Sequence, residues 1–384
     1  MSVTAAKGFR ASGVTAGLKP SGKPDLALVV NDGPRFDAAA VYTSNRCKAN
    51  PVLWSEQASA DGVVRAVVLN SGGANCYTGQ RGFQTTHKTA ERVAEKVGIG
   101  AIDVVVCSTG LIGVRLFEEK LLAGVDAAAA ELDSEGGMAA ATAIMTTDTR
   151  AKTVAITDAA GFSVGGIAKG AGMLAPGLAT MLVVLTTDAI ADQEALDAAL
   201  RNATAETFDR LDTDGCMSTN DTVVLMASGA SGIEAEPEAL NAAVLAACQS
   251  LTAQLHVDAE GAHHDIAITT RGADSVDDAV AASRSVARSN LFKAAVFGND
   301  PNWGRVLAAI GTTDAKFEPA DIDVAINDVW VCKAGTPDAD VSLVDLTPRE
   351  VSIVIDLHAG THEATIWTSD LTHDYVEENS AYST

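Results

Sequence analysis

The chain has 384 residues, of which 47% are hydrophobic, enough to build sizeable buried cores in one large domain or in two to three smaller ones. Acidic residues outnumber basic ones by 50 to 27, and the net charge of −23 opposes binding to nucleic acid because the few cations form no cluster. No apolar run approaches the length of about 18 residues that spans a membrane, and no signal-peptide core is present, so we expect a soluble, cytoplasmic protein with no membrane partner.

Short β-branched runs and segments of helical periodicity alternate along the chain. Up to residue 168 they predict strands at 26–30 and 64–69, a helix at 88–97, a strand at 104–108, helices at 117–132 and 136–145, and strands at 152–157 and 162–168. Beyond residue 180 they predict helices at 191–211 and 237–257 and strands at 221–228, 265–270, 321–326 and 350–357. The fold class is therefore α/β.

Several of these strands are apolar on both faces. This pattern is expected where helices cover one face of a sheet and a second sheet covers the other, so the sequence predicts a stacked, layered arrangement. The cysteines show no C-x-x-C spacing, which argues against a zinc knuckle or a redox pair and favours free thiols.

A glycine-rich stretch, KGAGMLAPGLATMLVVLTTDA at residues 169–189, invites a nucleotide-binding interpretation. Residues 170–175 satisfy the pattern G-x-G-x-x-[G/A] after a predicted strand. The phosphate-binding mechanism of that motif requires a helix directly after the glycines, whose N-terminal N–H groups meet the phosphate. Here Pro176 and Gly177 interrupt such a helix, and the β-branched run from Thr180 favours a strand, so the nucleotide interpretation is disfavoured.

Two interpretations of Thr180 remain open on the residues alone. In the first, the glycines form a turn between two strands and Thr180 is an ordinary strand residue. In the second, Thr180 is a nucleophile whose base is its own α-amino group, freed by cleavage of the preceding peptide bond. An α-amine has a reference pKa of about 7.7–8.0, which suits a general base at neutral pH.

The stretch at 169–189 also resembles the self-cleavage signature of the ornithine acetyltransferase family of arginine biosynthesis, also called the bifunctional glutamate N-acetyltransferases. Five further segments match this family in the same order along the whole chain. They are STGLIG at 108–113, AIMTTDT at 143–149, DAEGA at 258–262, GNDPNWGR at 298–305 and ENSAYST at 378–384.

The resemblance implies a precursor that cleaves itself between Ala179 and Thr180 into an α chain (1–179) and a β chain (180–384). The two chains would form one intertwined unit with the family's stacked αββα fold and assemble as an α2β2 heterotetramer. The implied reaction is a ping-pong transfer, in which Thr180 takes the acetyl group of N-acetylornithine, ornithine leaves, and glutamate accepts the acetyl group. No cofactor and no metal are implied, and acetyl-CoA is expected only as an optional second acetyl donor.

The family's functional residues carry over to matching positions of this sequence. Thr109 and Gly110 match the oxyanion-hole pair, a hydroxyl and a backbone N–H that stabilise a tetrahedral oxyanion. Thr180 is the nucleophile, and the matching substrate contacts, beside Thr180 itself, are Thr146, Lys169, Glu260, Asn379 and Thr384. Thr147 remains an alternative to Thr146.

Two local patterns suggest metals but are interpreted otherwise. His263 and His264 are adjacent on a predicted strand and would point to opposite faces, so they are not expected to share a metal with Glu260. Residues 212–215 lack the later ligands of a calcium loop and are interpreted as a turn.

The chain departs from the family at Gly177, where asparagine is common, and at Ala171, where serine is frequent, which puts the rate of cleavage in doubt. Competing hypotheses are a self-cleaving amidase or aminopeptidase of a related fold, an acetyltransferase paralogue of secondary metabolism, and a non-enzymatic binding module.

Overall fold

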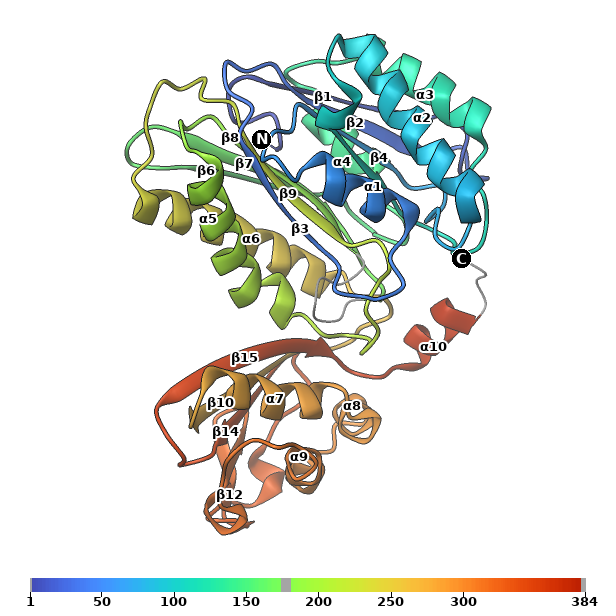
Figure 1. Cartoon of the computed structure of the whole chain (residues 1–384). Helices are drawn as coiled ribbons and strands as arrows, with labels where there is room; N and C mark the ends of the chain where they lie inside the picture. Colours follow the sequence, from blue (N-terminus) through green and yellow to red (C-terminus); the bar gives the residue numbers. More distant parts are fainter. Residues whose placement is uncertain (1, 174–180, 381–384) are drawn as a thin grey trace.

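The computed structural model describes residues 2–173 and 181–380. Its first part contains two sheets packed face to face (Figure 1). One sheet has the order β1-β2-β4-β5, formed by Phe9–Val14, Leu26–Asn31, Ala66–Asn70 and Val104–Ser108. The other has the order β3-β9-β8-β7-β6, formed by Ala38–Tyr42, Thr222–Ala227, Leu182–Thr187, Ser163–Lys169 and Lys152–Thr157.

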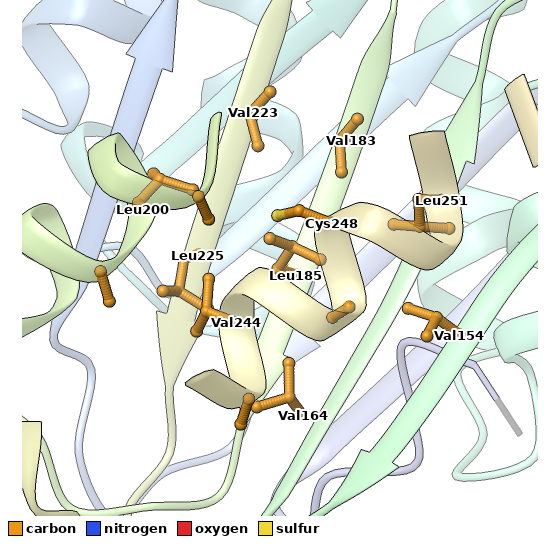
Figure 2. Close-up of a cluster of buried hydrophobic side chains, with 14 of the residues drawn as sticks. Val154, Val164, Val183, Leu185, Leu200, Val223, Leu225, Val244, Cys248 and Leu251 are labelled. Carbon is orange, nitrogen blue, oxygen red and sulfur yellow. The ribbon is translucent and has the colours of Figure 1, made fainter. Parts of the chain in front are cut away.

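Helices cover the outer faces of both sheets. The first sheet packs against α1 (Asn50–Ala58), α2 (Gly79–Val97) and α3 (Glu118–Ala130). The second packs against α5 (Gln193–Glu206) and α6 (Pro237–Val257), and Figure 2 shows the apolar side chains of this layer, including Leu185, Leu225 and Val244. The layers therefore follow the order helix, sheet, sheet, helix, which confirms the predicted stacked αββα class.

The burial of the strands explains why they are apolar on both faces. Every residue of β4, β5, β8 and β9 is buried, because one face meets helices and the other meets the opposite sheet. α4 (Gly137–Ala143) contributes Ala140 and Ile144, just beyond its end, to the core between the sheets. Each fully buried Val or Leu side chain contributes about 1.5–3 kcal/mol, so this double-sided burial is a large part of the driving force for the layered fold.

A third sheet forms a C-terminal lobe beside the stacked layers (Figure 1). Its order is β13-β12-β11-β14-β10-β15, formed by Thr336–Pro337, Val329–Lys333, Asp323–Ile326, Glu350–Asp356, Asp265–Ala273 and His362–Ser369. It shares a core with α7 (Val276–Ala287), α8 (Asn290–Phe297) and α9 (Trp303–Ile310). The chain then leaves this lobe through α10 (His373–Ser380).

Two predicted helices have different limits in the structure. α2 begins at Gly79 instead of 88, although its first half is rich in glycine and threonine; Thr85, Thr86 and Thr89 are buried and donate their hydroxyls to backbone carbonyls one turn earlier. The helix predicted at 191–211 ends at Glu206 and is followed by a short 3₁₀ helix, Phe208–Arg210. Within the described residues, no helix is long and apolar enough to cross a membrane.

Candidate active site

The candidate site lies where the ends of strands from both stacked sheets meet. Thr109 and Gly110 follow directly after β5 in the first sheet, and Lys169 is the last residue of β7 in the second. The Lys169 ammonium nitrogen Nζ lies 3.1 Å from Thr109 Oγ1. The structure thus brings together three predicted site residues that are about 60 positions apart in the sequence.

The backbone around Thr109 is held by the loop after β4. Thr109 N–H donates to Asn70 O at 2.9 Å, and Gly73 N–H donates to Thr109 O at 2.9 Å. Gly110 has a φ of +125°, and a Cβ there would lie 2.9 Å from Gly73 N, so only glycine fits this close approach. The Gly110 N–H makes no hydrogen bond within residues 2–173 and 181–380, so no described group competes for it.

Lys169 is only 2% exposed. Burial lowers the pKa of its ammonium group, while the negative charge of Asp148 opposes that shift. Asp148 accepts hydrogen bonds from Gly170 N at 2.7 Å and from Thr146 N at 2.9 Å. Asp148 therefore ties the predicted substrate contact Thr146 to the strand end that carries Lys169, whereas within residues 2–173 and 181–380 no hydrogen bond joins Thr147 to Asp148.

A second buried lysine contacts Asp148. Lys152 Nζ donates to Asp148 Oδ1 and to Asp258 Oδ2, both at 2.5 Å, and its side chain has no exposed surface. Asp258 also accepts the N–H and the hydroxyl of Thr149. Burial opposes ionisation of Asp148, but Lys169, Lys152 and the Gly170 N–H together hold the pKa of this carboxyl below its usual value.

Glu260 and Asn379 lie beside the backbone that follows Lys169. Glu260 N–H donates to Ala171 O at 3.0 Å, and Asn379 Nδ2 donates to Glu260 Oε2 at 3.2 Å. A Cβ at Gly172 would lie 2.3 Å from Glu260 Oε2, so the glycine lets the carboxylate approach the backbone. Asn379 lies on α10, and Tyr375 of the same helix packs against Gly261, so this helix lies beside Glu260.

Three predicted site residues, Ala179, Thr180 and Thr384, lie outside the described residues, as does Gly177. The first described residue after Thr180 is Met181, whose N–H donates to Asp221 Oδ1 at 3.0 Å. Asp221 is fully buried, and this burial raises the pKa of its carboxyl well above the usual value. Leu182 then pairs with Lys169 in the sheet, as the predicted strand after residue 180 requires.

The two adjacent histidines hold different aspartates. His263 Nε2 lies 2.7 Å from Asp374 Oδ2, and His264 Nδ1 lies 2.7 Å from Asp370 Oδ2. In the described part of the chain, no group of three or more His, Cys, Asp or Glu residues is arranged to hold a metal ion. Asp212 accepts the Gly215 N–H at 3.1 Å, which closes the turn predicted at 212–215.

A separate cavity lies away from these residues. It has a volume of about 690 Å³ and opens between α6 and the C-terminal sheet, with Thr252, His256 and Trp367 among its lining residues. None of the predicted site residues lines this cavity, so it is separate from the candidate active site.

Sequence reasoning missed four charged residues of the site: Asp148, Lys152, Asp221 and Asp258. Asp148 and Asp258 lie inside the quoted AIMTTDT and DAEGA segments, so the motifs contained them. The spacing of four between Asp148 and Lys152 is no signal outside a helix, and the contact of Lys152 with Asp258 spans 106 positions between β6 and the residue after α6.

Known proteins are similar to this chain, two of them over its full length. The model of the ArgJ family matches residues 10–384. An arginine biosynthesis bifunctional protein ArgJ from Streptomyces avermitilis is 64% identical over 383 residues, and one from Streptomyces coelicolor is 63% identical, each alignment covering 100% of both proteins. A solved ornithine acetyltransferase from Mycobacterium tuberculosis, complexed with ornithine, is 54% identical with a TM-score of 0.45, over 47% of this chain and 96% of that chain.

Proposed function

The chain belongs to the ArgJ family, and from this membership we propose how its residues carry out acetyl transfer. It is an acetyltransferase of arginine biosynthesis that moves the acetyl group of N-acetylornithine to glutamate. The meeting of Lys169 and Thr109 beside the strand that begins just after Thr180 is the observation that best supports the residue assignments below.

Thr180 is the nucleophile. Its hydroxyl oxygen attacks the acetyl carbonyl carbon of N-acetylornithine, the carbonyl π electrons move to the oxygen, and the hydroxyl proton passes to the α-amine freed by cleavage after Ala179. The tetrahedral intermediate then collapses with cleavage of the C–N bond, and ornithine leaves with that proton. Glutamate attacks the acetyl ester in the same way, giving N-acetylglutamate and restoring Thr180.

The other residues stabilise the oxyanion and orient the substrate. The Thr109 hydroxyl and the Gly110 N–H donate to the oxyanion. Lys169 and Thr146 contact the substrate, with the Lys169 ammonium suited to an α-carboxylate, and Glu260 suits a substrate ammonium group because a carboxylate accepts charge-assisted hydrogen bonds. Asn379 and Thr384 complete the substrate contacts from the C-terminal segment.

The processed form consists of an α chain of residues 1–179 and a β chain of residues 180–384. Strands β7 and β8 pair across the cleavage point, so the two chains share one sheet and stay associated. We propose an α2β2 heterotetramer located in the cytoplasm. No cofactor is needed for the transfer. Acetyl-CoA is a second acetyl donor only if the enzyme also catalyses direct acetylation of glutamate by acetyl-CoA.

The transfer is tested by its products. Incubation with N-acetylornithine and glutamate is expected to release ornithine and form N-acetylglutamate in equal amounts, measured by mass spectrometry. Ornithine with free acetate would instead indicate a hydrolase, the amidase alternative. A parallel reaction with acetyl-CoA and glutamate tests the second donor, and a panel of other amine acceptors tests the secondary-metabolism alternative.

The position of Glu260 is tested at Gly172. In Gly172→Ala the new Cβ would lie 2.3 Å from Glu260 Oε2, so the flexible carboxylate moves while the backbone, whose φ is not positive, stays. We expect the KM for N-acetylornithine to rise about tenfold with little change in kcat, because binding that the ground state and the transition state share is weakened. Gly304→Ala, where the nearest atom lies at 3.5 Å, is the matched control. An unchanged KM would contradict the role of Glu260.

A further inference from the structure

Binding of a substrate carboxylate by Lys169 does not require its contact with Thr109. An ammonium group carries donors and no acceptor, so Lys169 Nζ is the donor and Thr109 Oγ1 the acceptor in their 3.1 Å hydrogen bond. The single Thr109 hydroxyl proton therefore points away from the lysine. Within residues 2–173 and 181–380 this hydroxyl makes no second hydrogen bond, so its proton has no described acceptor.

The ammonium group is held firmly in this position. Lys169 pairs with Leu182 in the sheet, and the neighbouring Ala168 pairs with Lys152 on the other side of the strand. The next residue, Gly170, donates its N–H to Asp148. Because both the backbone and the charged surroundings are fixed, Lys169 cannot swing like a surface lysine, and its hydrogen bond to Thr109 is part of a preorganised arrangement.

We propose that Lys169 is a positioning residue of the acyl-transfer step, which orients and polarises the Thr109 hydroxyl as a donor to the tetrahedral oxyanion. A hydroxyl that accepts a hydrogen bond from a cation becomes a stronger donor, because hydrogen bonds in a chain polarise one another. No proton is transferred to or from Lys169 in this role. The inference rests on the proposed functions of Thr109 and Thr180.

The test uses two acetyl donors. One is N-acetylornithine, and the other is p-nitrophenyl acetate, which has neither an α-carboxylate nor an amino group and reports only acetylation of the enzyme. In Lys169→Met we expect kcat with N-acetylornithine and the first-turnover rate of p-nitrophenolate release from the ester both to fall at least about tenfold, since a weakened oxyanion donor acts on every tetrahedral intermediate. A loss confined to the KM for N-acetylornithine, with an unchanged ester rate, would overturn the proposal and leave Lys169 as a carboxylate contact.

A double-mutant cycle tests the coupling directly. Thr109→Val is expected to lower both rates about 10²- to 10³-fold, as loss of an oxyanion donor does. Adding Lys169→Met to Thr109→Val is expected to cause little further loss of the ester rate, because the lysine acts through the hydroxyl. Multiplicative losses would overturn the proposal. Thr109→Ser, which keeps the hydroxyl, is expected to retain most of the activity.

Controls distinguish a failure of the proposed role of Lys169 from a failure of the proposed oxyanion role of Thr109. Rates are expressed per cleaved chain, quantified by denaturing electrophoresis, and Lys316→Met, an exposed lysine paired with Asp274, is the matched control. If Lys169→Met does not fold, Lys169→Gln carries the same test: its neutral amide can still donate, so a partial loss with both donors supports the proposal and an unchanged ester rate overturns it. An undiminished ester rate in Thr109→Val would instead refute the oxyanion role of Thr109.

Discussion

Replacing Thr180 with alanine is expected to leave an intact chain of 39.3 kDa and to lower acetyl transfer by about 10⁴- to 10⁶-fold, the loss seen when a catalytic nucleophile is removed. The substitution removes the hydroxyl that attacks in both self-cleavage and acetyl transfer, so one change abolishes two activities. Denaturing electrophoresis with N-terminal sequencing measures the first, and ornithine release measures the second.

Two variants define the specificity of that result. Thr180→Ser keeps both a hydroxyl and an α-amine, so cleavage into chains of 179 and 205 residues is expected to persist. Thr157→Ala, at an exposed threonine at the end of β6, is expected to be cleaved and active. Transfer activity retained in Thr180→Ala, or a single full-length band from fully active wild-type protein, would contradict the assigned nucleophile.

The sequence predicted the strands of the stacked sheets well, for a physical reason. Segments 26–30, 104–108 and 152–157 are β-branched runs buried on at least one face, and they form β2, β5 and β6 within one residue of the expected limits. The start of α2 was wrong because threonine and glycine are weak helix formers, and only tertiary burial shows that their hydroxyls are satisfied within the helix.

The arrangement of the third sheet could not be predicted from local pattern. Strands 265–270, 321–326 and 350–357 were expected, but in the structure β10 pairs in parallel with β14 across about 85 positions, and no periodicity encodes such a pairing. The candidate site likewise combines residues that local motifs predict with contacts that only the folded structure reveals. The residues came from motifs, whereas the hydrogen bond from Lys169 to Thr109 and the burial of Asp221 come from the meeting of separate strands.

Breaking the buried ion pairs of Lys152 with Asp148 and Asp258 is expected to have the second large effect. Lys152→Met leaves Asp148 and Asp258 without the ammonium group that lies 2.5 Å from each, and removing one partner of a buried ion pair costs about 3–5 kcal/mol. Urea unfolding in the Thr180→Ala background, where the chain stays uncleaved, measures this loss at matched protein concentrations. Lys88→Met breaks an exposed pair with Glu118 and is expected to cost at most about 1 kcal/mol.

The loss in Lys152→Met is expected to depend on pH with a defined sign. In the wild type the folded-state pKa of Asp148 is lowered, so its contribution to stability is present above its unfolded pKa and is lost as the pH falls through the folded one. Without Lys152, Asp148 keeps its burial and the charge of Lys169 but loses one of the groups that lower its pKa, so this pKa rises, and the penalty is full at neutral pH and shrinks as the Asp148 carboxyl takes up a proton. The difference in unfolding free energy between wild type and variant is therefore expected to be smaller at pH 4 than at pH 7. An equal difference at both pH values would mean that Lys152 stabilises the fold by packing alone and that the carboxylates beneath the site do not depend on its charge.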